Sequence, residues 1–419
     1  PIAQKTAIFY THSSDGYAVV ATISGTSVSF GSKVQSDGTG GTQFIQSVSF
    51  DSTINKIVFA YRNGGNNVGY VNTGTISGTS ISFGTKLEIA GGAYYYACTY
   101  SPDANRTSIV FRDTDNDGAS VVFRAAATNL NLTAENYIGM SSGGVEYDEG
   151  AASLGSAVVF EAAETVFISS TFDSANNRVV ICYVDGGNSN YATAIVGTVS
   201  ATNISFGSEV AFASHEISFL TSTFDSSNNK IVLAYKNEAN NQGTAIVGTV
   251  SGTGISFGTA VVFSTLSTAS VGSTFDTAAG KVLLTFDTGG AVTRIISGTV
   301  SGTGISFSAS TIFTGLTLSQ SFTIPNYNSV TNNVLIVLTD SGNSAYGTAV
   351  VFSEEIRGQV ASGSSASVDI IGTVSTNQAG LTPGQSYFVQ TDGTLALTAG
   401  TPSVFAGTAI SATKLLVKT

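Results

Sequence analysis

The chain has 419 residues, of which 42% are apolar and 10% are charged, and its formal net charge is −11. No basic run offers a groove for a phosphate backbone, and the acidic balance opposes docking on anionic membranes. We therefore expect no nucleic-acid partner. Few charges together with 47 glycines and many Ser, Thr, Val and Phe residues are typical of short strands joined by tight turns.

No apolar stretch of about 18 residues is present, so we expect no membrane insertion. The first ten residues lack a basic region followed by an apolar run, so no signal peptide is expected here, although a chain with its leader removed would look the same. Cys98 and Cys182 lie in strand-like runs. We interpret both as small buried hydrophobes, with a disulfide as the alternative.

A unit of about 50 residues recurs along the chain and organises it. Its turn position falls at Asp51, Ser101, Asp173, Asp225, Asp276 and Asn328, in steps of 50, 72, 52, 51 and 52 residues. The long step marks an insertion near residues 126–150. A period of about 50 residues is typical of a four-stranded propeller blade.

The unit that contains Asp173 predicts four strands, at residues 168–172, 178–184, 193–199 and 204–212. The turns between them carry Gly, Asn and Asp, which tolerate positive φ and bond their own backbone. The unit is therefore an antiparallel meander. Such a meander must bury its apolar faces against its neighbours, and a closed ring of blades does so without leaving a long open edge. An open β-solenoid is the alternative.

Runs of the second-strand type occur seven times and predict seven blades, with six as the alternative. They begin at Ala7, Ile57, Ser108, Val179, Ile231, Val282 and Val334. The first unit lacks a leading strand, and we expect the C-terminal side of the ring to supply it. The predicted fold is all-β, with a propeller over residues 1–353 and a small C-terminal β module over residues 354–419. In that module, Pro383-Gly384 and Asp392-Gly393 predict tight turns among about five short strands.

The run NQAGLTPGQSYFVQTDGTLA, followed by PSVFAGTAISATKLLVK, resembles the C-terminal module of tail-fibre and other appendage proteins of marine bacteriophages of the cyanophage type. The repeats STFDSxNNKIV and GTAIVGTVSGTxISFGT are similar to repeats of the same group. The segment TAENYIGMS, residues 133–141, resembles the family segment that leads into the tail module, but here it lies mid-chain. The resemblance implies a place on the virion surface and recognition of a host surface.

Little in the sequence indicates catalysis. His12 and His215 are the only histidines, and they lie in unrelated repeats, where we interpret both as loop residues. One carboxylate per repeat, as at Asp51, Asp173 and Asp225, is better explained by side-chain bonding within the turn than by the carboxylate pair of a glycosidase. There is also no tryptophan, so the Asp-box of sialidase-type propellers is absent. We expect no enzyme.

Two groups of loop residues are candidates for binding. Asp113, Asp115 and Asp117 precede Gly118, a spacing that suits calcium, although the later acidic ligand is missing and a solvated hairpin tip is the alternative. The loops between second and third strands vary while the strands repeat, which favours recognition. Their candidate residues are Arg62, Asn63, Asn66, Asn67, Asp185, Asn188, Asn190, Tyr191, Asn237, Asn240 and Asn241. The run Tyr94–Tyr96 is either a contact patch or a strand start that packs between blades.

These observations favour a non-enzymatic virion surface appendage, a tail fibre or decoration protein, that adheres to a host-surface glycan or protein. Its expected partners are other virion proteins and the host surface, it requires no cofactor unless calcium binds, and a homotrimer is left open. The alternative is a secreted bacterial adhesin or a lectin-like, carbohydrate-binding propeller. A carbohydrate-active propeller enzyme is a third hypothesis.

Overall fold

The computed structural model describes residues 5–12, 15–36, 43–125, 151–288, 292–313, 324–340, 346–353, 374–375, 379–390, 394–399 and 404–417. The chain divides into two compact units, Pro1–Ser353 and Glu354–Thr419. The predicted insertion near residues 126–150 lies outside the described residues. Within the described ranges, no helix is long and apolar enough to cross a membrane.

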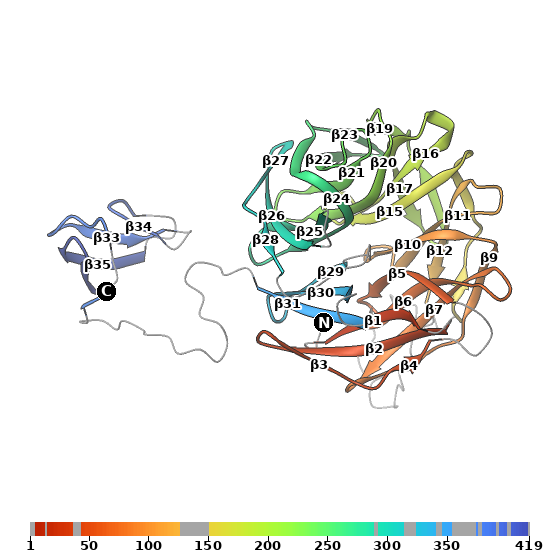
Figure 1. Cartoon of the computed structure of the whole chain (residues 1–419), viewed down its shortest axis with the longest axis horizontal. Coiled ribbons are helices and arrows are strands. Elements are labelled where there is room, and N and C mark those ends of the chain that lie inside the picture. The colour runs from red at the N-terminus through yellow and green to blue at the C-terminus, as the bar shows by residue number, and fades with distance from the viewer. Residues whose placement is uncertain are drawn as a thin grey trace, which may run out of the picture. The chain divides into compact units, whose positions relative to one another are not determined.

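The first unit contains seven antiparallel sheets that follow one another along the chain, here called blades 1 to 7. The first strands of blades 2 to 7 lie side by side around the centre of the ring (Figure 1). These inner strands are β5 (Gln43–Asp51), β10 (Tyr94–Ser101), β15 (Thr165–Asp173), β20 (Ile217–Asp225), the second half of β24 (Val261–Asp276) and β29 (Ile324–Asn328).

Each inner strand pairs with a second strand, and each second strand pairs with a third. The second strands are β1 (Lys5–His12), β6 (Lys56–Asn63), β11 (Arg106–Arg112), β16 (Arg178–Asp185), β21 (Lys230–Asn237), β25 (Lys281–Thr288) and β30 (Asn333–Asp340). The third strands are β2 (Asp15–Ser24), β7 (Val68–Ser77), β12 (Gly118–Arg124), β17 (Tyr191–Ser200), β22 (Gln242–Ser251), β26 (Val292–Ser301) and β31 (Tyr346–Phe352). A short 3-10 helix, Gly186–Asn188, lies between β16 and β17.

In blades 1 to 6 the outer strand is broken in two, and both pieces pair with the third strand, whereas the described part of blade 7 contains only β29, β30 and β31. The pieces are β3 (Ser27–Phe30) and β4 (Val34–Gln35), β8 (Ser80–Phe83) and β9 (Leu87–Gly91), β13 (Ser153–Leu154) and β14 (Val158–Glu161), β18 (Asn203–Phe206) and β19 (Val210–Ala213), β23 (Gly254–Phe257) and the first half of β24, and β27 (Gly304–Phe307) and β28 (Thr311–Ile312). The break lies where the next blade approaches closely. At the break in blade 4, a Cβ on Gly207 would lie 1.9 Å from the Thr253 carbonyl oxygen of blade 5, so only glycine fits there.

The core consists of seven apolar clusters, one at each boundary between blades. Strand β16 shows how the sequence builds them, because alternate side chains of a strand point to opposite faces. Val179 and Ile181 pack toward blade 3, whereas Val180 and Cys182 pack toward blade 5. Both cysteines are buried and free, which confirms their interpretation as small hydrophobes.

The ring closes where blade 1 meets blade 7 (Figure 1). Ala21 and Ile23 of blade 1 pack against Leu335 of blade 7, and the Asn333 side-chain amide donates to the Gly25 carbonyl at 2.9 Å. The seven-bladed ring is thereby confirmed over the solenoid and over six blades. Among the described residues, β1 pairs with β2. The strand expected from the C-terminal side of the ring stays a prediction, because residues 354–373, which follow blade 7, lie outside the described residues.

The repeated aspartates hold their own turns, as predicted. In blade 5, Asp225 Oδ1 accepts hydrogen bonds from the backbone amides of Ser227 (2.9 Å) and Asn228 (3.0 Å), and Oδ2 accepts one from the Asn228 side chain (2.9 Å). Asp51, Asp173, Asp276 and Asn328 accept equivalent backbone bonds. These turn side chains, four carboxylates and the Asn328 amide, are structural.

The second unit contains a separate antiparallel sheet with the order β32-β36-β35-β33-β34. Its strands are β32 (Val374–Ser375), β33 (Ser386–Val389), β34 (Leu395–Ala396), β35 (Val404–Ser411) and β36 (Lys414–Val417). Leu381, Tyr387, Ala409 and Leu415 form its core. Gly384 has a φ of +83°, as the predicted Pro383-Gly384 turn requires. The second predicted turn, Asp392-Gly393, lies outside the described residues.

Candidate binding surface on the loop face

One face of the ring carries the loops between second and third strands together with the connections between blades, and we call it the loop face. Backbone hydrogen bonds tie the two sets of segments to each other. The Gly186 amide donates to the Glu164 carbonyl at 2.7 Å, and the Thr268 amide donates to the Asn241 carbonyl at 2.9 Å. Because the strands of a blade alternate in direction, the aspartate turns lie at the opposite face.

Most of the loop residues singled out from the sequence lie on this face but hold their own loops. The side-chain oxygens of Asn63, Asn66, Asn237 and Asn240 accept hydrogen bonds from backbone amides two residues further along. Others adopt the left-handed backbone that hairpin tips need, namely Asn67, Asn190 and Asn241. Asn188 is exposed at a tip, and Tyr191 begins β17. Arg62 and Asp185 also bond within their own loops, to the Asn67 side chain and the Asn188 amide, and each makes further contacts beyond its loop.

Arg62 belongs to a cluster of two arginines and two tyrosines across blades 2 and 3. Its guanidinium carbon lies 4.1 Å from the centre of the Tyr94 ring. Arg112 lies 5.4 Å from the same ring and 4.9 Å from the Tyr95 ring. Arg112 also forms an ion pair with Glu164 at 3.2 Å. The cluster therefore places planar cationic donors, aromatic faces and a carboxylate side by side on the loop face.

The inner strands display aromatic side chains at a strained bulge beside this cluster. Tyr95, Phe167 and Phe219 each lie six residues before the turn residue of their blade. Their φ values are 53°, 50° and 52°, in the left-handed region that bulky residues avoid. Tyr95 is 41% exposed and Phe167 is 36% exposed, and the Phe167 and Phe219 rings lie 6.4 Å apart. We call these three residues the aromatic arc.

The run Tyr94–Tyr96 thus divides between the two interpretations offered for it. Tyr94 and Tyr95 join the cluster on the loop face. Tyr96 packs in the core between blades 2 and 3, where its hydroxyl donates to the Ala93 carbonyl at 3.2 Å and burial raises its pKa.

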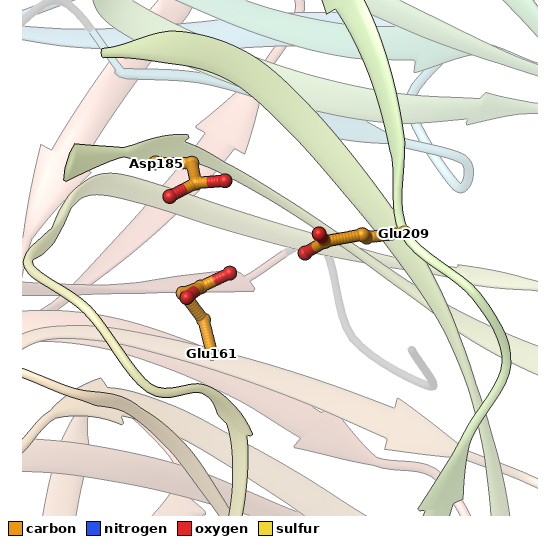
Figure 2. Close-up of side chains that lie close together, drawn as sticks. All are labelled: Glu161, Asp185 and Glu209. Carbon is orange, nitrogen blue, oxygen red and sulfur yellow. The ribbon is translucent and has the colours of Figure 1, made fainter. Parts of the chain in front are cut away.

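Three carboxyl groups meet at the boundary between blades 3 and 4. Glu161 ends β14, Asp185 ends β16, and Glu209 lies between β18 and β19. One oxygen from each lies within 4.8 Å of the others, and Figure 2 shows the three side chains pointing toward one another. The Tyr183 hydroxyl, at 3.1 Å from Glu209 Oε2 and 3.4 Å from Glu161 Oε2, lies against two of them. We call Glu161, Asp185 and Glu209 the acidic cluster.

Crowding of like charges changes how the acidic cluster titrates. Burial, followed by the hydrogen bond to Glu209 and the charge of Asp185, raises the pKa of Glu161 from 4.5 to about 7. Burial and the charge of Glu209 also raise the pKa of Asp185. A proton shared between carboxyl groups relieves their repulsion, as it does in carboxylate dyads. Three hard oxygen donors are also the kind of ligand that calcium takes.

The predicted calcium loop has a different geometry. Asp113 Oδ1 accepts hydrogen bonds from the backbone amides of Asp115 (2.9 Å) and Asp117 (3.0 Å), which caps the hairpin tip. Among the described residues, the acidic cluster is the group that brings three ligand atoms together, and Asp113, Asp115 and Asp117 are not part of it. Calcium at this loop stays a prediction. Of the two histidines, His215 lies in a loop as expected, whereas His12 is the last residue of β1.

Sequence reasoning missed most of this surface. Arg112 and Glu164 lie beyond the loops that were considered, and Glu161 and Glu209 come from different blades. A signal was available for the aromatic arc, because its members occupy the same position of three successive repeats. The left-handed bulge on which they lie leaves no mark in residue type.

Comparisons with known proteins identify the fold. The periplasmic gluconolactonase PpgL of Pseudomonas aeruginosa is 10% identical, with a TM-score of 0.52 over 83% of this chain and 96% of that chain. A protein from Lactobacillus plantarum is 11% identical, with a TM-score of 0.50 over 83% and 97%. The SapL1 lectin in complex with α-methyl fucoside is 12% identical, with a TM-score of 0.45 over 76% and 95%.

No family model and no curated protein matches the sequence. The likeness to the first two structures confirms the predicted class, an all-β protein built as a β-propeller. At such low identity it shows the fold alone, so the ligand has to be argued from the loop face.

Proposed function

We propose that the ring is a non-catalytic, lectin-like propeller that binds glycan on its loop face. The observation that carries the proposal is the cluster of Arg62, Tyr94, Tyr95 and Arg112 beside the aromatic arc. Sugars present apolar C–H faces and dense hydroxyl groups. Aromatic rings stack on the former, and arginine forks and carboxylates bond the latter.

The strained bulge supports the same proposal. Backbone strain of roughly 1–3 kcal/mol per residue persists where function or packing requires it. Tyr95 and Phe167 remain well exposed despite that cost, so packing accounts for little of it. A rigid ring holds these side chains in a fixed arc, which lowers the entropy cost of binding a ligand with few contacts.

The setting we propose is the exterior of a virion, because the repeats and the C-terminal segment resemble those of marine phage appendages. Other virion proteins and a host-surface glycan are then the partners. Mass spectrometry of purified virions tests the setting. Finding the chain only in secreted bacterial fractions would favour the adhesin instead.

The binding proposal is tested with an array of bacterial surface polysaccharides and the full chain. We expect Phe167→Ala and Arg112→Ala each to weaken the best glycan by about tenfold, which corresponds to about 1.4 kcal/mol. Phe30→Ala is the matched control, because Phe30 is an exposed aromatic residue on an outer strand. Equal losses in all three variants, or release of oligosaccharides during incubation, would contradict the proposal.

A further inference from the structure

The aromatic arc repeats one side-chain position in three successive blades. Its strands, β10, β15 and β20, lie side by side around the centre of the ring (Figure 1). Hydrogen bonds between hydroxyl groups join these strands. Thr99 bonds Ser170 across blades 3 and 4, and Ser169 bonds Ser222 at 2.8 Å across blades 4 and 5. Because the three blades repeat one backbone geometry, the three aromatic rings follow one another on the loop face.

The arc stops at blade 6 in the described part of the chain. The equivalent residue there is Ser270, which has the same left-handed backbone, with a φ of 51°, but is buried. In blade 2 the sequence has Ile45 at this position, and in blade 7 the position falls at Phe322, outside the described residues. The bulge is therefore a property of the repeat, and the choice of side chain decides which blades present a ring.

Charged groups border the arc at both ends. At the blade 3 end, Arg112 lies 4.9 Å from the centre of the Tyr95 ring and holds an exposed carboxylate. At the blade 5 end, Lys236 of β21, the strand paired with β20, forms an ion pair with Glu238 at 2.8 Å. Three aromatic faces thus lie between two sets of hydrogen-bonding groups. This order suits a chain of sugars whose apolar faces lie over the rings and whose hydroxyls reach the charged groups.

We propose that the aromatic arc binds an internal stretch of a polysaccharide, with three or more consecutive sugar units, rather than a single terminal sugar. This inference rests on the proposed function. A linear glycan that follows the arc stacks on one ring after another, and each stacking contact adds to its affinity. Packed inner strands hold the rings in place, so a longer ligand gains contacts without further ordering of the protein.

A ladder of oligosaccharides tests the inference. The probes are size-separated fragments of the polysaccharide that binds best on the array, from one to eight sugar units, titrated calorimetrically against the full chain. Affinity is expected to rise about tenfold or more between the single sugar and the fragment that spans the arc, because two further rings are then covered. Beyond that length it is expected to level off.

Variants at the two ends of the arc show which rings the chain covers. Tyr95→Asn and Phe219→Asn remove one ring each and keep the bulge, because asparagine adopts the left-handed backbone readily. Each is expected to weaken the spanning fragment about three- to tenfold and to move the levelling-off to a shorter fragment. Phe30→Asn, at an exposed aromatic residue on an outer strand, is the control and is expected to leave the ladder unchanged.

The outcomes separate this inference from the proposed function. A single sugar that binds as tightly as the longest fragment, and that Phe167→Ala still weakens, would overturn the inference and leave glycan binding standing. A loss in only one of the two end variants would also overturn it, because a single-sugar site would then lie at that end. The wild-type ladder decides alone if a variant fails to fold. Binding of no fragment and no polysaccharide would overturn both proposals.

Discussion

Replacing Glu161 with glutamine removes the carboxyl group of the acidic cluster that retains its proton near neutral pH. Its pKa is about 7 in the folded ring against 4.5 in the unfolded chain. Between these values the folded protein binds a proton that the unfolded chain has released. Stability therefore falls as pH rises through this range, because unfolding then releases a proton.

The size of the effect follows from the same two values. A difference between 4.5 and about 7 corresponds to roughly 3.4 kcal/mol for a fully buried carboxyl group. Glu161 is only partly buried, so solvent screening reduces this to about 1–2 kcal/mol. We expect this loss in the wild-type protein between pH 4.5 and pH 8. Glu161→Gln keeps the shape of the side chain without its charge and abolishes that part of the pH dependence.

Urea unfolding at half-unit steps from pH 4.5 to pH 8 measures the difference. Burial also raises the pKa of Asp287 to about 6, so wild-type stability has a second slope in this range. The informative quantity is therefore the wild-type free energy of unfolding minus that of Glu161→Gln. Glu88→Gln, at an exposed glutamate on β9, is the control. Parallel profiles for wild type and Glu161→Gln would refute the reasoning.

Three further outcomes are expected from urea unfolding. Gly207→Ala loses about 1–3 kcal/mol because its Cβ would meet the Thr253 carbonyl oxygen at 1.9 Å, whereas Gly254→Ala, with its nearest atom at 3.6 Å, loses less than 1 kcal/mol; similar losses would contradict the tight packing of adjacent blades. Asp225→Ala loses about 1–2 kcal/mol of unfolding free energy, because it removes the acceptor of two backbone hydrogen bonds. Asp225→Asn keeps an acceptor oxygen and therefore retains most of the wild-type stability. A large loss in the asparagine variant would show that the charge matters instead. Asp113→Asn and addition of EDTA each leave the midpoint unchanged if Asp113 only caps its hairpin, and a shift with EDTA that is lost in Asp113→Asn but kept in Glu161→Gln would favour calcium at that loop.

The repeat made the fold predictable. Side chains that alternate between two apolar faces, as in Val179–Cys182, specify a blade that needs a neighbour on each side. One turn residue per unit, as at Asp225, sets the register of every hairpin. The missing inner strand of blade 1 was also visible in the sequence. The packing of Ala21 and Ile23 against Leu335, which joins blades 1 and 7 in the described part of the chain, was not visible, because it depends on how the two blades meet.

The binding surface was less predictable, for physical reasons. Asn63 and Asn237 attracted notice as polar loop residues, but most such side chains satisfy their own backbone. The contacts that define the surface, such as Arg112 with Tyr94, cross from one blade element to another. They depend on the register between blades and on a left-handed bulge, and residue type encodes neither.

The most direct test of the account is a crystal structure of the full chain with the glycan that binds best on the array. The account predicts a sugar ring on the loop face, stacked on the aromatic arc and within hydrogen-bond distance of the Arg112 guanidinium. Sugar density at the aspartate turns or on the outer strands, with the arc and Arg112 untouched, would contradict it.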